Sequence, residues 1–387
     1  MKRMETGRRG LALAATTILL AGCQIIPKAP GPATPMPTPT PTPEPSATQL
    51  PTDQTRHRVA LLVPMSGRTG AVGQSIANAT TMALLDTNAD NIRITTYDTA
   101  TGARDAAAKA VADGNKLILG PLLGANVPAV QAEARTSGIP IVSFSNDTRI
   151  ASPDVFVMGH IPEQSVERSV RYARAQGANN FAAIVPNGDY GQRAEAALTA
   201  TLRREGGNLI ATERYDRGNT SITSAGQRLA TRGGFDTVLI ADGAELATQA
   251  ARQVNANGNT RILGTELWSG EAAVTRSAAL RGALFSAVPD ARYRRFSESY
   301  ESRFGEKPYR ISTLGYDAVL LTLRVARDWK VGRVFPTNRL RDEGGFLGLD
   351  GSFRFASDGV VQRMMEVREI RDGNVVVVDA APTSFGN

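Results

Sequence analysis

The hydrophobic pattern of the chain changes between two periods from residue 57 onward. Short runs of branched apolar side chains, such as RVALLVP at 58–64, are typical of buried β-strands. Stretches with small and apolar residues at helical spacing follow them, as at 72–88. This alternation of strands and helices predicts right-handed crossovers and parallel sheets, which is the α/β class.

The alternation runs twice along the chain, and this repetition predicts two lobes. In the first unit we predict strands at 58–64, 91–98, 116–120 and 138–145, with helices at 72–88, 103–113 and 126–137. In the second we predict strands at 179–186, 208–215, 235–241 and 261–268, with helices at 163–176, 191–205, 221–231 and 244–257. Further helices are predicted around 296–304 and 312–328, then strands at 351–355, 363–370 and 374–379. Asp372-Gly373 is typical of a hairpin turn between the last two strands.

The first 22 residues have the pattern of an export signal. Four basic residues precede an uncharged apolar run at 11–21, which is shorter than the ~20 residues that a permanent membrane helix needs. Leu20-Ala21-Gly22-Cys23 resembles the lipobox of bacterial lipoproteins. The resemblance implies that Cys23 carries lipid, and Gln24 after it implies an outer-membrane anchor facing the periplasm. An ordinary signal peptide with a chance cysteine is the alternative.

Residues 23–56 read as a tether between this anchor and the folded body. Prolines recur at almost every second or third position of 27–52, and proline blocks helices and sheet ladders. At ~3.1 Å per residue such a segment reaches on the order of 90 Å. The tether would therefore hold the body well away from the membrane.

Composition narrows the possible functions. The net charge of +7 in 387 residues is mild and is not gathered in a stripe, so we expect no nucleic-acid partner. Cys23 is the only cysteine, so no intramolecular disulfide can form. His57 and His160 are the only histidines, and nothing around them suggests a catalytic triad or a metal site. We expect His160 to be a hinge or packing residue, and we expect no enzyme, no metal and no cofactor.

A glycine pattern after the first strand deserves comparison with phosphate-binding loops. Gly67, Gly70 and Gly73 lie three residues apart, which is neither the dinucleotide spacing nor a nucleotide P-loop with its lysine. We interpret the pattern as a tight strand-to-helix turn.

These segments together resemble the type 1 periplasmic-binding fold, the family of leucine/isoleucine/valine-binding proteins. The resemblance covers 57–380 and is carried by VALLVPMSGRTGAVGQSIANAT, KLILGPLLGANVPAVQ, GIPIVSFSND, AAIVPNGDYGQ, GYDAVLLTLRVA and LDGSFRFASDG. A narrower resemblance is to lipoprotein activators of class A penicillin-binding proteins. The fold implies three crossings between lobes, which we place near 160, 287 and 344. Lobe 1 would be 57–160 plus 287–344, and lobe 2 would be 161–286 plus 345–387.

The fold implies a ligand cleft between the lobes, at the carboxyl ends of the strands. The candidate cleft residues are those at predicted strand ends: Ser66, Ser143, Ser145, Asn146, Tyr190, Asp242 and Glu266. By resemblance to amino-acid binders, Ser143 and Ser145 would hold a carboxylate, and Asp242 or Glu266 an ammonium group. The loop at 122–125 departs from that pattern, because Leu-Leu-Gly-Ala stands where those binders place hydroxyls. Turn capping is the alternative role of each serine.

The basic, aromatic segment DARYRRFSESYESRFGEKPYR contains a candidate partner surface, Arg292, Arg294 and Arg295. Its alternative is a solvated helix face over a packed aromatic stripe. The sequence as a whole favours a non-enzymatic lipoprotein that activates a class A penicillin-binding protein in peptidoglycan synthesis. The rival is the substrate-binding lipoprotein of an ABC importer for a small polar ligand, and a third possibility is a sensor whose ligand controls the partner contact.

Overall fold

The computed structural model describes residues 55–256 and 258–385. Residues Leu50–Asn387 form one compact unit. All of the buried members of its five hydrophobic clusters lie between Val59 and Ile370, so this unit carries its own cores. The predicted signal, Cys23 and nearly all of the predicted tether lie outside the described residues. Among those described, no helix is long and apolar enough to cross a membrane.

Lobe 1 is built on a five-stranded sheet that is parallel throughout. Its strands, in the spatial order β2-β1-β3-β4-β5, are β1 (His57–Val63), β2 (Ile92–Asp98), β3 (Leu117–Leu119), β4 (Ile141–Ser143) and β5 (Val155–Val157). Alternate side chains of β1 enter opposite cores, because successive residues of a strand point to opposite faces. Val59 and Leu61 pack in one core, and Ala60 and Leu62 pack in the other.

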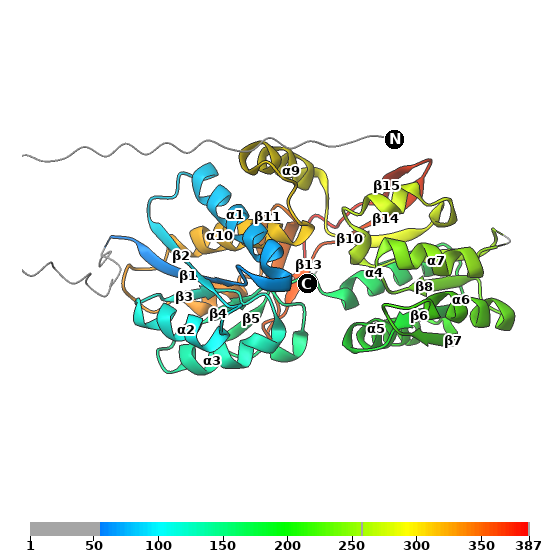
Figure 1. Cartoon of the computed structure of the whole chain (residues 1–387), viewed down its shortest axis with the longest axis horizontal. Helices are drawn as coiled ribbons and strands as arrows, with labels where there is room; N and C mark the ends of the chain where they lie inside the picture. The colour runs from blue at the N-terminus through cyan, green and yellow to red at the C-terminus, as the bar shows by residue number, and fades with distance from the viewer. Residues whose placement is uncertain (1–54, 257, 386–387) are drawn as a thin grey trace, which may run out of the picture. The chain divides into compact units, whose positions relative to one another are not determined.

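Two helices cover each face of this sheet (Figure 1). The face of Val59 is covered by α1 (Gly70–Asp86) and α10 (Thr313–Ala326), and the opposite face by α2 (Ala103–Ala112) and α3 (Val127–Arg135). Helix α9 (Ala291–Phe304) packs on α1 through a smaller aromatic cluster around Phe296 and Tyr300. The aromatic stripe predicted for this segment therefore packs inward.

Lobe 2 contains a seven-stranded sheet with the order β15-β14-β10-β9-β8-β6-β7. The strands are β6 (Asn180–Pro186), β7 (Asn208–Tyr215), β8 (Thr237–Ile240), β9 (Arg261–Leu263), β10 (Leu284–Ala287), β14 (Glu366–Arg371) and β15 (Asn374–Asp379). Five of them are parallel, and β14 and β15 form an antiparallel hairpin at one edge. Both residues of its turn, Asp372 and Gly373, have positive φ, as a two-residue hairpin requires.

Helices cover both faces of the lobe 2 sheet as well. One core contains side chains of α4 (Pro162–Ala175) and α5 (Asp189–Glu205). The other contains those of α6 (Ser221–Arg232), α7 (Ala244–Val254) and α8 (Ala272–Arg276). Short 3-10 helices lie at Gly67–Thr69, Gly124–Asn126, Thr148–Ile150, Glu266–Trp268, Ala278–Leu280, Arg310–Ser312 and Thr337–Arg341.

A third, antiparallel sheet moves one of the expected lobe boundaries. It consists of β11 (Phe346–Gly348), β12 (Gly351–Phe355) and β13 (Val361–Arg363). We placed the third crossing near 344, but Phe346, Phe353 and Phe355 belong to the lobe 1 core. The Phe355 ring meets that of Phe156 edge-on, with centroids 5.3 Å apart. The chain enters the lobe 2 sheet only after β13, because burying these rings stabilises 346–363 on lobe 1.

Candidate functional site

A cavity of about 500 Å³, which we call the inter-lobe cavity, opens where loops of the two lobes meet. Lobe 1 lines it with Val72, Leu122, Leu123, Gly124, Phe144, Ser145, Asn146, Tyr309, Arg310 and Ile311. Lobe 2 contributes Glu266, Leu267, Ser269 and Glu271, and His160 lines it from the first crossing. Several of these loops follow the carboxyl ends of β3, β4 and β9, where open parallel sheets place their ligands.

The lobe 1 wall of the cavity is mainly apolar, and the two serines at the carboxyl end of β4 have backbone partners. Ser143 is fully buried and donates to the Pro121 carbonyl at 3.0 Å. The Ser145 hydroxyl lines the cavity and accepts the backbone N–H of Asp147 at 3.0 Å. The first bond ties the end of β4 to the loop after β3, and the second closes a turn within the loop after β4. The capping role left open for both serines is therefore the one that the contacts display.

The lobe 2 wall presents an acidic side chain, Glu266, at the start of a 3-10 helix. The Tyr190 hydroxyl lies 3.1 Å from Glu266 Oε1 and 2.8 Å from the Thr265 hydroxyl. Glu266 Oε2 is buried and has no hydrogen-bond partner among the described residues. Burial raises the pKa of Glu266 to about 7, against the lowering effect of the Tyr190 hydrogen bond. The carboxyl group can therefore accept or donate a proton near neutral pH.

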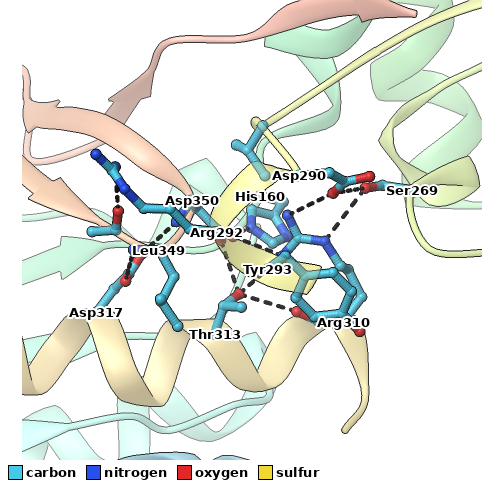
Figure 2. Close-up of polar contacts among 12 residues, drawn as sticks. His160, Ser269, Asp290, Arg292, Tyr293, Arg310, Thr313, Asp317, Leu349 and Asp350 are labelled. Atoms are coloured by element: carbon cyan, nitrogen blue, oxygen red, sulfur yellow. Dashed lines mark hydrogen bonds and ion pairs between the residues drawn. The ribbon is translucent and has the colours of Figure 1, made fainter. Parts of the chain in front are cut away.

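Beside the cavity, a buried carboxylate joins residues from distant parts of the chain (Figure 2). Asp350 is fully buried and accepts hydrogen bonds from Arg310 Nη1 at 2.7 Å and Thr313 at 2.9 Å. The ring of His160 also contacts this carboxylate, with Nε2 lying 2.7 Å from Asp350 Oδ2. Arg310 extends toward lobe 2, where its Nε lies 3.4 Å from the Ser269 hydroxyl. We call Asp350, His160, Arg310 and Thr313 the Asp350 cluster.

Two further buried ionisable residues, Arg363 and Asp317, flank this cluster. Arg363 donates to the Met158 carbonyl at 2.8 Å and lies 3.9 Å from Asp350 and 4.0 Å from Asp317. Burial opposes the charge on Asp350, but Arg310, His160 and Arg363 together hold its pKa well below its usual range. Burial and the neighbouring Asp350 charge raise the pKa of Asp317 to about 7. The surrounding charges thus keep Asp350 ionised, and the Asp350 charge in turn favours the protonated form of Asp317.

The chain matches, over residues 57–374, the family described as periplasmic binding protein. The chain belongs to this family. Its fold is that of the Leu/Ile/Val-binding type. The solved structure described as a putative branched-chain amino acid ABC transporter from Rhodospirillum rubrum superposes on it with a TM-score of 0.72 and 20% identity. The superposition covers 84% of this chain and 100% of that one. Leucine binding protein LivK from Thermotoga maritima gives 0.65 at 18% identity, with coverages of 84% and 98%. The predicted two-lobed fold is confirmed.

Two curated relatives carry further similarity. An uncharacterized protein of Rickettsia prowazekii is 24% identical over 339 residues, which are 83% of this chain and 88% of that protein. Penicillin-binding protein activator LpoA of Photobacterium profundum is 29% identical over 140 residues. That match covers 35% of this chain and spans only 23% of the activator. The periplasmic binding protein thus shares a segment with an activator and its fold with transport proteins.

Three of the seven candidate cleft residues line the cavity of this periplasmic binding protein: Ser145, Asn146 and Glu266. The other four lie elsewhere. Ser143 is buried behind the wall, and Tyr190 lies behind Glu266. Ser66 is exposed and does not line the cavity, and its hydroxyl lies 3.4 Å from Asp98 Oδ2.

All of the hydrogen bonds to the Asp242 carboxylate come from residues of lobe 2. It accepts from Arg217 Nε at 2.7 Å, from its neighbour Gly243 at 2.8 Å, and from the Tyr215 hydroxyl. The carboxylate therefore joins β7 to β8 within the lobe 2 framework. Strand-end position was too coarse a signal to separate such structural carboxylates from those that face the cavity.

Sequence reasoning missed Tyr309, Arg310 and Glu271 as lining residues. Arg310 belongs to the short KPYRIS segment before α10, which no periodic pattern marks as part of a site. His160 was predicted as a hinge or packing residue; it lies at the first crossing, lines the cavity and contacts Asp350. Only the topology that brings 160, 310 and 350 together could have revealed this.

The remaining motifs have structural explanations. A Cβ atom at Gly73 would lie 1.7 Å from the Pro64 carbonyl oxygen, so this glycine lets α1 pack closely after β1. Within the described residues, no group of three or more His, Cys, Asp or Glu side chains could hold a metal ion. Arg292, Arg294 and Arg295 are exposed on α9, where Arg292 donates to the Gly348 carbonyl at 3.0 Å.

Proposed function

We propose that this periplasmic binding protein is a lipid-anchored, non-enzymatic module that activates a class A penicillin-binding protein in peptidoglycan synthesis. The observation that carries the proposal is the 29% identity to activator LpoA over 140 residues. The lipobox-like LAGC and the proline-rich 27–52 support an anchor at the outer membrane with a long reach into the periplasm.

One loop of the inter-lobe cavity counts against an amino-acid importer. The loop after β3 presents Leu122 and Leu123, where the amino-acid binders that this chain resembles place hydroxyls. The Ser143 hydroxyl is used by the Pro121 carbonyl, and the Ser145 hydroxyl accepts a backbone N–H. A ligand carboxylate would therefore depend on donors from other loops, because a buried charge needs such bonds to replace its hydration.

Activation in this proposal is a population shift. The module would bind the active conformer of the synthase more tightly than the inactive one, because only differential affinity can move such an equilibrium. The exposed arginines of α9, Arg294 and Arg295, are the proposed contact. Neither guanidinium has an ion pair or hydrogen bond among the described residues to give up, and arginine is enriched at binding hot spots.

The test is glycan-strand synthesis by the organism's class A synthase on lipid II, with and without Leu50–Asn387. We expect a several-fold rate increase and retention of the synthase in a pull-down. The double variant Arg294→Glu/Arg295→Glu should lose most of both effects. Its matched control is Arg276→Glu/Arg281→Glu, which reverses two exposed arginines of lobe 2 and should leave both intact. Absence of stimulation and binding for every class A synthase of the organism would refute the proposal.

A second function, solute binding for an ABC importer, is favoured by one observation. The inter-lobe cavity holds about 500 Å³, which is within the range of small-molecule sites. Glu266, with its unpartnered oxygen, would then select a ligand that offers a hydrogen-bond donor beside an apolar part. A screen of small polar metabolites by thermal unfolding tests this, because a bound ligand raises the melting temperature by mass action. A ligand whose effect disappears in Glu266→Gln would support this function.

A further inference from the structure

The end of α10 and the loop that follows it, residues 324–341, carry a dense group of cations. This segment contains five arginines and one lysine but only one acidic residue, Asp328. Asp328 lies 3.4 Å from Arg339, so its charge is already balanced. Arg324 and Arg327 lie at the carboxyl end of α10, where the helix dipole favours cations. The remaining cations of the loop need another explanation.

Lys330 and Arg333 are the first and last residues of a β-turn in this loop, which we call the Lys330–Arg333 turn. The Arg333 N–H donates to the Lys330 carbonyl at 3.1 Å, and Gly332 has the positive φ that a type II turn needs at its third position. Both cationic side chains are exposed, and neither has an ion pair or hydrogen bond among the described residues. Their charges are therefore available to an anionic partner.

Two exposed valines lie beside these cations. Val331, within the turn, is 41% exposed, and Val334, directly after it, is 66% exposed, more than any other large apolar side chain of the described residues. The flanking residues are anchored, because Trp329 is buried and donates from Nε1 to the Arg333 carbonyl at 2.9 Å, and Phe335 is buried as well. The fold thus holds two apolar side chains in water next to unpaired cations.

The turn lies at the end of lobe 1 where the chain enters the fold. The Trp329 ring stacks on that of His57, the first residue of β1, with centroids 4.0 Å apart and planes 18° apart. The sequence before the fold is the predicted proline-rich tether, and before that comes Cys23 with its predicted lipid. The tether therefore joins the body beside the turn. With the tether extended, this end of the body would be the one closest to the anchoring membrane.

We propose that the Lys330–Arg333 turn docks on an anionic phospholipid surface, with its two cations at lipid phosphates and with Val331 and Val334 inserted between the headgroups. An anionic bilayer attracts basic side chains, and apolar side chains beside them add affinity by leaving water. Docking would keep the body at its membrane, and release would free it to extend on the tether. Which membrane the turn meets rests on the lipid anchor of the proposed function, but the affinity of the turn for anionic lipid does not.

The first experiment is sedimentation of Leu50–Asn387, which contains all of the cores, with vesicles of phosphatidylglycerol and, separately, of phosphatidylcholine. We expect binding to phosphatidylglycerol vesicles that weakens as salt is added, because salt screens exposed charges. The double variant Lys330→Gln/Arg333→Gln should weaken this binding about tenfold or more, since each cation near the surface contributes. The matched control Arg276→Gln/Arg281→Gln removes the same charge from exposed positions of lobe 2 and should stay close to the parent.

A second measurement reports insertion. Leu50–Asn387 contains no cysteine, so Val334→Cys can be labelled at one position with an environment-sensitive fluorophore. We expect a blue shift with phosphatidylglycerol vesicles and none for the label at Leu347→Cys, an exposed control position on β11. Val334→Ser should weaken vesicle binding about fivefold, because an apolar side chain no longer leaves water. Its thermal unfolding should stay close to that of the parent, since the side chain is largely exposed.

The proposal is overturned if phosphatidylglycerol vesicles are bound no better than phosphatidylcholine vesicles, or if binding survives both Lys330→Gln/Arg333→Gln and Val334→Ser. A dimer in vesicle-free sedimentation that Val334→Ser abolishes would assign the valines to a second copy and would also overturn it. The variant Arg294→Glu/Arg295→Glu, which tests the synthase contact, should keep most of its vesicle binding. The two proposals can therefore fail separately.

Discussion

Neutralising the Asp350 carboxylate should destabilise the protein more than removing any surface ion pair. Asp350 is fully buried and is contacted by Arg310 and His160 at 2.7 Å and by Thr313 at 2.9 Å. Asp350→Asn keeps the shape but removes the charge, so the buried Arg310 and Arg363 lose their main counter-ion. Breaking a buried pair in this way costs about 3–5 kcal/mol, a large part of the ~5–15 kcal/mol that typically separates folded from unfolded chains.

The assay is denaturant unfolding of Leu50–Asn387 followed by circular dichroism. The matched control is Asp328→Asn, whose pair with Arg339 at 3.4 Å leaves both side chains more than half exposed; it should lose less than about 1 kcal/mol. Arg310→Met in the Asp350→Asn background should cost less than the sum of the single losses, because the stranded cation is then removed. If Asp350→Asn lost no more than the control, the electrostatic reasoning about this cluster would be wrong.

Three other predictions concern single sites. Because the pKa of Glu266 is raised from 4.5 to about 7, the folded state binds more protons between these values, so stability should fall as pH rises through this window, by at most ~3 kcal/mol; Glu266→Gln should flatten that part of a stability–pH profile. Gly73→Ala should cost about 2 kcal/mol or more, since its Cβ would lie 1.7 Å from the Pro64 oxygen, whereas Gly243→Ala, in open space, should stay within about 1 kcal/mol in the same melts. Phe296→Ala should lose about 3–5 kcal/mol in urea unfolding because the ring is buried against α1; an unchanged midpoint would contradict the packing of α9.

The elements that the sequence predicted well are those with long, regular patterns. The 57–63 and 208–215 strands and the 221–232 helix lie within a residue or two of their predicted bounds. Some short strands, such as β3 and β4, were predicted because they lie within longer apolar runs. β5 and β10 were missed, because three or four residues cannot display a period. They are recognisable only through the neighbouring strands with which they pair.

The lobe boundary and the site depended on information that is not local. The sequence predicted the strand at 351–355, but which core receives Phe353 and Phe355 is decided by packing. Strand ends correctly indicated Ser145, Asn146 and Glu266 as lining residues, since carboxyl ends of parallel strands share one edge. Asp242 also follows the end of a parallel strand, but its carboxylate is hydrogen-bonded within lobe 2 and does not line the cavity. Position at a strand end does not determine which partners a side chain has.

The Asp350 cluster also constrains how this protein can change over evolutionary time. A single replacement within the cluster leaves a buried charge or donor unmatched, and the resulting loss of about 3–5 kcal/mol approaches the stability of many domains. Replacing the whole set by apolar side chains of similar volume can be neutral or even stabilising. Variants with only one of these residues replaced should therefore be too unstable to persist. Descendants of this chain should either keep all four residues or have replaced all of them together.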